Sequence, residues 1–202
     1  MTTTTQKKTT TRSKTSTTKK SADAPIKELP TNPFAFEVLQ LVSSQRTKEK
    51  KIEVLKKHEH PSLKAIFIWN FDETVISLLP PGEVPYASVG DQNSFSGTIT
   101  EKIDDAVSKM NEIGSNSLGS QDQGHSSIRK EYQKFYNFVK GGNDGLSSLR
   151  RETMFINILQ GLHPLEAEIL CLVKDKKLEE KYKITKEIIS EAYTDISWGG
   201  RS

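Results

Sequence analysis

Residues 148–173, SLRRETMFINILQGLHPLEAEILCLV, decide the fold class. Large apolar side chains recur in them every three or four positions, the spacing of a helix that buries one face. Gly161 interrupts the pattern, and Pro164 stands where proline favours the first position of a new helix. We therefore predict a helix over 148–160, a tight turn and a second helix from 164. The predicted inward side chains are Leu149, Phe155, Ile156 and Leu159, then Leu165, Ile169, Leu172 and Val173.

The same order of features occurs earlier in the chain. Ile52-Glu-Val-Leu55 precedes His60-Pro61 and an apolar helix, as Ile156-Asn-Ile-Leu159 precedes His163-Pro164. Each set is typical of a helix, a proline turn and a second helix. Two interpretations stay open, a duplicated helical hairpin or a chance recurrence of a common pattern.

Further helices are predicted from their start signals. Asn32 can cap a helix that has Pro33 at its first position, and Thr47 can cap the next one. Thr98 and Glu101 have the spacing of a capping box. The helix that this box starts has apolar positions at Ile99, Ile103, Val107, Met110 and Ile113. Two more helices are indicated, one by Ile128 to Val139, ending at Gly141-Gly142, and one by Ile184 to Ala192. We predict an all-α protein, a compact helical bundle built from helical hairpins.

The domain organisation follows from composition and charge. Residues 1–24 are rich in threonine and lysine and lack large apolar side chains after Met1, so we predict a disordered tail. The whole chain carries +3, whereas its first 20 residues carry +6 and no acid, from Lys7, Lys8, Arg12, Lys14, Lys19 and Lys20. A helical domain is predicted over 25–195, with a flexible polar insert at about 83–128 in which the helix from Ile99 could dock. Residues 196–202 are predicted to be a loose C-terminus, although Trp198 could be a docking anchor.

Several kinds of chemistry lack their sequence patterns. The chain has one cysteine, and no apolar run reaches the roughly 18 residues of a membrane span. It has no phosphate-binding loop, dinucleotide fingerprint or nucleophile elbow. His58 and His60 lie two positions apart, so on a helix their rings diverge and cannot share a metal ion. Cys171 sits in an apolar run, as a core residue does. We predict a non-catalytic protein of the reducing cytoplasm, without cofactor, metal or membrane partner.

Three basic groups are the candidate binding residues. They are Lys48, Lys51 and Lys56; Arg150 and Arg151; and Lys174, Lys176 and Lys177. Such residues can contact phosphates along a duplex backbone. They can equally be solvated surface side chains without a partner. The basic tail has the same two interpretations, a mobile cationic arm for a polyanion or a solubilising extension.

Two resemblances bear on this choice. Residues 36–58 (FEVLQLVSSQRTKEKKIEVLKKH), 141–151 (GGNDGLSSLRR) and 184–193 (ITKEIISEAY) resemble the N-terminal helical domain of T4-like phage ATP-dependent DNA ligases. Residues 78–82 (LLPPG), 149–153 (LRRET) and 173–178 (VKDKKL) resemble short uncharacterised proteins of T4-like marine and cyanobacterial phages. The ligase resemblance implies a helical platform that holds duplex DNA, with Lys48, Lys51, Arg150 and Arg151 as phosphate contacts. The ligases' nucleotidyl-transfer motif is missing, so adenylation is not implied.

Two functions are therefore expected. The first is a non-catalytic phage protein that binds duplex DNA through its backbone. The second is a protein-interaction or virion component, in the host cytoplasm or the virion, that docks on another phage or host protein. The net charge of −3 over residues 21–202 favours the second. A single positive face that joins Lys48, Lys51, Arg150 and Arg151 would favour the first, and scattered lysines would favour the second.

Overall fold

The computed structural model describes Met1 and residues 28–85, 97–113 and 124–200, and these residues form an all-α body. Within these ranges there are helices and two isolated β-bridges but no strand. The all-α prediction is confirmed. The helices are α1 (Ala35–Ser44), α2 (Lys48–Lys57), α3 (Pro61–Phe71), α4 (Ile99–Ile113), α5 (Ile128–Glu131), the 3-10 helix η1 (Tyr132–Phe138), α6 (Ser148–Gly161), α7 (Pro164–Lys174), α8 (Leu178–Tyr182) and α9 (Lys186–Ala192).

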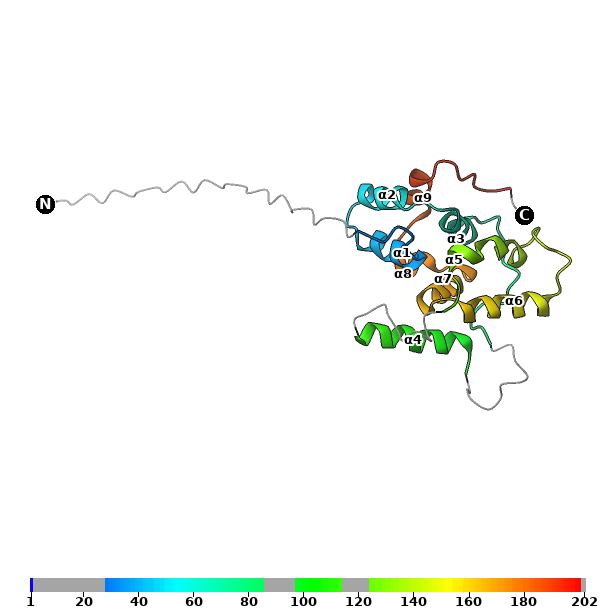
Figure 1. Cartoon of the computed structure of the whole chain (residues 1–202). Coiled ribbons are helices and arrows are strands. Elements are labelled where there is room, and N and C mark those ends of the chain that lie inside the picture. Colours follow the sequence, from blue (N-terminus) through cyan, green and yellow to red (C-terminus); the bar gives the residue numbers. More distant parts are fainter. Residues whose placement is uncertain (2–27, 86–96, 114–123, 201–202) are drawn as a thin grey trace.

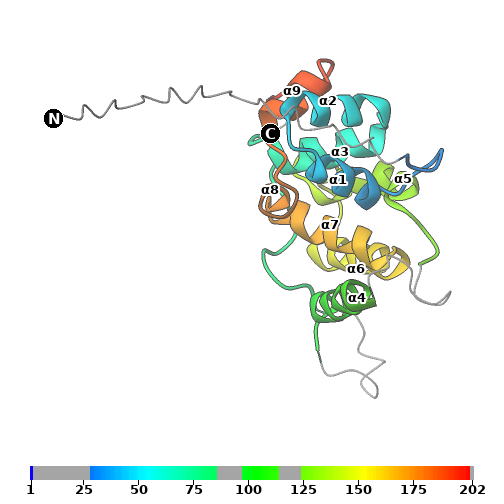
Figure 2. The same ribbon diagram turned by 90° about the vertical axis from the view of Figure 1, so that its left-hand side faces the viewer.

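Helix α7 is the centre of the packing. It contacts α1, α3, α4, α6 and α8, and its side chains Ala167, Ile169, Leu170 and Val173 are fully buried. Figures 1 and 2 show α2 and α9 side by side at one end of the body and α4 at the other, with α7 between them. A helix that packs on every side needs an apolar surface all round, which explains the dense run from Leu165 to Val173.

Both proline turns form as predicted, and each is capped by histidine. The Nδ1 atom of His60 accepts the N–H of Ser62 over 3.1 Å, and Pro61 opens α3. The Nδ1 atom of His163 accepts the N–H of Leu165 over 3.2 Å, and Pro164 opens α7. The sequence similarity between the two hairpins therefore corresponds to the same local structure.

Three helix predictions need correction. Pro33 is not the first residue of α1, because the helix begins at Ala35 and the Glu37 carboxylate accepts the N–H of Phe34 over 2.8 Å. The single helix predicted from Ile128 is instead the short α5 followed by η1. Leu149 was predicted to be buried but is 75% exposed, because it lies in the first turn of α6 beyond the reach of α7.

The predicted insert at 83–128 contains a packed helix. The side chains of Ile99, Ile103, Val107 and Met110 are buried where α4 meets α7. Thr98 and Glu101 form the predicted capping box, with N–H to oxygen distances of 2.8 and 3.1 Å. This part of the insert is therefore docked on the body, while residues 86–96 and 114–123 lie outside the described ranges.

The described C-terminal residues, up to Gly200, are also tied to the body, contrary to the loose end predicted over 196–202, of which residues 201–202 lie outside the described ranges. Ile196 is buried, and Trp198 packs against the core with the Lys186 ammonium 5.1 Å from its ring centre. The N–H of Gly199 donates to the buried Asp72 carboxylate over 2.9 Å. Trp198 is therefore an anchor within the chain.

Candidate functional site

The fold separates the three predicted basic groups. Lys48, Lys51 and Lys56 lie on α2, Arg150 and Arg151 lie in the first turn of α6, and Lys174, Lys176 and Lys177 surround the turn between α7 and α8. Figures 1 and 2 both place α2 and α6 well apart, on either side of the central helices. Lys48 and Lys51 therefore lie on a helix well apart from the one that carries Arg150 and Arg151.

Arg151 is an internal structural residue. Only 5% of it is exposed. Its guanidinium donates to three backbone carbonyls, those of Asn137 (2.7 Å), Asn143 (3.1 Å) and Leu146 (3.0 Å). These bonds fasten the loop that leads from η1 into α6. The prediction that Arg151 contacts phosphate is wrong, because the residue is buried and its Nε and one Nη atom already donate to backbone carbonyls.

Lys174 is buried as well, with 4% of the residue exposed. Its ammonium donates to the carbonyls of Pro80 (2.8 Å) and Gly82 (2.9 Å) and pairs with Asp175 (2.6 Å). It holds the turn at 80–82 against the end of α7. The prediction of phosphate contact is therefore also wrong for Lys174.

The remaining candidates differ in whether their side chains already make hydrogen bonds or ion pairs. The Lys48 ammonium pairs with Glu191 of α9, and this hydrogen bond raises the pKa of Lys48. Lys51 donates to the carbonyl of Lys183, and Lys176 donates to the carbonyl of Asp72. Lys56, Arg150 and Lys177 are exposed, and their side chains make no hydrogen bond or ion pair with another described residue, but they lie on three separate segments. The tail residues Lys7 to Lys20 lie outside the described ranges.

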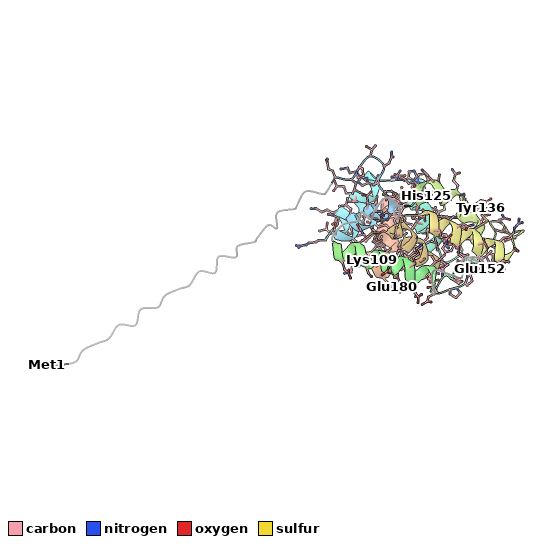
Figure 3. The ribbon with its side chains drawn as sticks, turned by 60° about the horizontal axis from the view of Figure 1, so that its bottom comes forward. Met1, Lys109, His125, Tyr136, Glu152 and Glu180 are labelled. Carbon is pink, nitrogen blue, oxygen red and sulfur yellow. The ribbon has the colours of Figure 1, made fainter. Side chains whose placement is uncertain are left out.

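The described body has an open apolar groove between α3 and η1. We call it the α3–η1 groove; it measures about 310 Å³ and is lined mainly by Ala65, Ile68, Trp69, Tyr132, Tyr136 and Val139. That volume is at the lower end of the range for ligand pockets. Tyr136 is 54% exposed and stands at the edge of the body in Figure 3. A solvent-exposed aromatic ring beside an apolar groove is typical of a docking site.

Local backbone geometry shapes this groove. The segment Ile76 to Leu78 pairs antiparallel with Phe138 to Lys140, through hydrogen bonds of 2.8 and 2.9 Å. Gly142 lies so close to η1 that a Cβ atom there would stand 1.8 Å from the carbonyl oxygen of Tyr136. The tight turn at Gly141-Gly142 therefore fixes the end of η1 that carries Tyr136.

Trp69 forms the floor of the groove and joins it to the core. Its ring packs on Phe138 at 5.9 Å and on Phe135 at 5.4 Å between centroids. Trp69 is 2% exposed, and its buried Nε1–H finds no acceptor among the described residues. A buried donor without an acceptor costs about 1–3 kcal/mol.

The charge around the groove is positive. The segment from Arg129 to Lys140 carries four basic residues, Arg129, Lys130, Lys134 and Lys140, against Glu131 alone. Arg129 donates to the carbonyl of Pro33, and Lys134 pairs with Glu131. Lys130 and Lys140 are exposed. Lys140 is the charged member of the groove lining.

Other reactive groups of the described body are held in structural settings. Burial raises the pKa of the Cys171 thiol to about 12, so it carries little thiolate. Burial lowers the pKa of His58 and of His60, and Arg129 acts on both in the same direction. The described ranges contain no group of three or more potential metal-ligating side chains.

Sequence reasoning missed this groove. The sequence indicated one continuous helix from Ile128 to Val139, whereas in the structure Tyr132 of η1 and Val139, which follows it, line the groove. The available signal was the pair Tyr132 and Tyr136, four positions apart, with Lys140 a further four positions on. It could not be read without knowing that α5 passes into a 3-10 helix.

The comparisons with known proteins bear on the family alone. No curated protein and no solved structure matches the chain. None of the described helices combines the length and the apolar character needed to cross a bilayer. The model of a family of unknown function, DUF6433, matches residues 38–110 and 115–180, which is well over half of the chain. The chain therefore belongs to the DUF6433 family.

Proposed function

We propose that this protein is a non-catalytic docking protein whose α3–η1 groove binds an apolar segment of a partner protein. The observation that carries the proposal is the open apolar groove itself, in which Trp69 forms the buried floor and Tyr136 is 54% exposed. Tyr136 and Ile76 are exposed side chains near the paired segments 76–78 and 138–140, and burial against a partner would remove them from water.

Duplex DNA binding by the helical body has less support. Binding through the phosphate backbone needs several exposed cations that track the duplex. Arg151 and Lys174 are buried, and Lys48 is paired with an acidic residue of α9. A DNA-binding role would rest on Lys56, Arg150 and Lys177, which lie apart, and on the basic tail. The ligase-like platform is thus the alternative proposal.

A peptide selection on the intact protein tests the docking function. A random peptide library is displayed, and the peptides that bind immobilised full-length protein are recovered and synthesised. We expect them to share large apolar side chains and to lose binding in the variant Tyr136→Ala. Leu149→Ala is the matched control, because it also removes an exposed apolar side chain but lies outside the groove.

A titration with labelled duplex DNA tests the alternative function, DNA binding by the helical body. If the body were a DNA platform, a protein that lacks residues 1–24 would still bind DNA, with a log–log salt slope of about 0.9 per phosphate neutralised. That outcome, together with recovered peptides that bind Tyr136→Ala as well as wild type, would overturn the docking proposal.

A further inference from the structure

We infer that the segment bound in the α3–η1 groove belongs to another protein and carries acidic side chains beside its apolar residues. This inference rests on the docking function proposed above. It specifies the partner by the charge that surrounds the groove rather than by the groove's apolar lining.

The first argument is the sign of the charge at the rim. Lys140 lines the groove, its side chain is exposed, and its backbone N–H is bonded to the carbonyl of Ile76. The backbone of Lys140 is therefore fixed by its pairing with Ile76, while its ammonium group is exposed to an incoming ligand. Lys130 adds a second exposed cation on the segment that leads into η1.

The acidic residues near the groove do not belong to its lining. Glu131 is paired with Lys134 and accepts the Ser126 hydroxyl. Asp144 accepts the N–H of Gly141. Glu73 is exposed between α3 and Val75 but does not line the groove. Asp144 keeps its charge, but neither it nor Glu73 lines the groove, whose lining has Lys140 as its charged residue. An incoming acidic segment therefore gains attraction there that a basic one does not.

The second argument excludes the chain's own tail as the occupant. Residues 1–20 carry six basic residues and no acid. Their charge has the same sign as Lys130 and Lys140, so the tail would be repelled from the rim. An acidic partner segment is instead complementary in charge.

The third argument separates a protein partner from a single-stranded nucleic acid. Nucleic acids bind such sites by stacking successive bases on exposed aromatic faces. Here Trp69 and Phe135 are buried and pack on other core rings, which leaves Tyr136 as the strongly exposed ring of the groove. The geometry favours the insertion of apolar side chains over the stacking of bases.

The test uses peptides recovered by the selection described above, resynthesised with one common apolar core. Three versions carry glutamate, serine or lysine on both flanks, and their dissociation constants are measured with the intact protein. Each exposed charge pair should change the affinity by about two- to fivefold. We expect the glutamate version to bind most tightly and the lysine version most weakly, and this difference should shrink at high salt.

Charge reversal at the rim provides the decisive comparison. Lys140→Glu should invert the order of the three peptides, and Lys177→Glu, which changes an exposed lysine away from the groove, should leave the order intact. If all three versions bind equally well, and still need Tyr136, the acidic partner is overturned while the docking function stands. If single-stranded oligonucleotide binds and competes for Tyr136 while no peptide does, both proposals fail.

Discussion

The carboxylate of Glu166, at the start of α7, accepts the backbone N–H of Ala35, the first residue of α1, over 2.9 Å and across 131 positions of sequence. Its other oxygen accepts the N–H of Ile128, the first residue of α5, over 2.8 Å. The first N–H groups of a helix have no partner within that helix. One fully buried side chain thus supplies the missing acceptor for two helices.

Removal of this carboxylate should destabilise the fold. Glu166→Ala leaves two buried N–H groups without an acceptor, so we expect the free energy of unfolding to fall by about 2–5 kcal/mol. Glu166→Gln keeps one acceptor oxygen and should cost less than the alanine variant. Urea unfolding measures both. Glu179→Gln, on an exposed position of α8, is the control, and a Glu166→Ala variant as stable as that control would contradict the account.

The two arginines at positions 150 and 151 should behave differently, although they are neighbours. Arg151→Ala removes the donors that hold three carbonyls of the η1–α6 loop, and we expect a loss of about 2–4 kcal/mol in unfolding free energy. Arg150→Ala should change stability by no more than about 0.5 kcal/mol, as exposed substitutions usually do. Equal effects of the two substitutions in urea unfolding would show that Arg151 is not the internal residue described.

The stability of the fold should fall as the solution is acidified below about pH 6.5. His60 caps α3 through its unprotonated Nδ1 atom, and burial, with Arg129 nearby, lowers its pKa below the ordinary 6.5. The unfolded chain therefore takes up the proton first as the pH falls. The contribution of His60 is complete above pH 6.5 and is lost between that value and the lower pKa of the folded state.

The variant His60→Asn separates the cap from the titration. Asparagine is a good N-cap but does not titrate in this range. Unfolding free energies measured from pH 8 to pH 5, values chosen to bracket the ordinary pKa of about 6.5, should decline less steeply for this variant than for wild type. His58, whose pKa is also lowered, accounts for part of the slope that remains. A wild-type slope that is unchanged in His60→Asn would contradict the role of the cap.

The sequence was sufficient where local chemistry decides the structure. The caps at Thr47 and Thr98 and the proline starts at Pro61 and Pro164 depend on neighbouring residues alone, and all four form as predicted. The echo between the two hairpins is local for the same reason. This similarity correctly indicated that the two hairpins share a local structure, including the histidine before each proline.

The errors concern residues whose surroundings come from distant parts of the chain. Lys174 looks like a surface cation in sequence, but the carbonyls that surround it lie more than ninety positions away. The partners of Arg151 lie only 5 to 14 positions earlier, but their carbonyls point at it only because the loop from η1 folds back on α6. Leu149 fits the helical pattern yet extends beyond the body. The α3–η1 groove combines α3 with residues more than sixty positions away, so its existence could not be inferred from either segment alone.

The two indole N–H signals of the intact protein, from Trp69 and Trp198, test the central claim most directly. They are assigned in a nitrogen–proton correlation spectrum with the variant Trp198→Phe, and a peptide recovered by the selection is then added. We predict that the Trp69 signal shifts, because the peptide fills the groove that the Trp69 ring lines, and that Trp198 changes less. A bound peptide that leaves Trp69 unchanged, or that shifts Trp198 instead, would contradict docking in the α3–η1 groove.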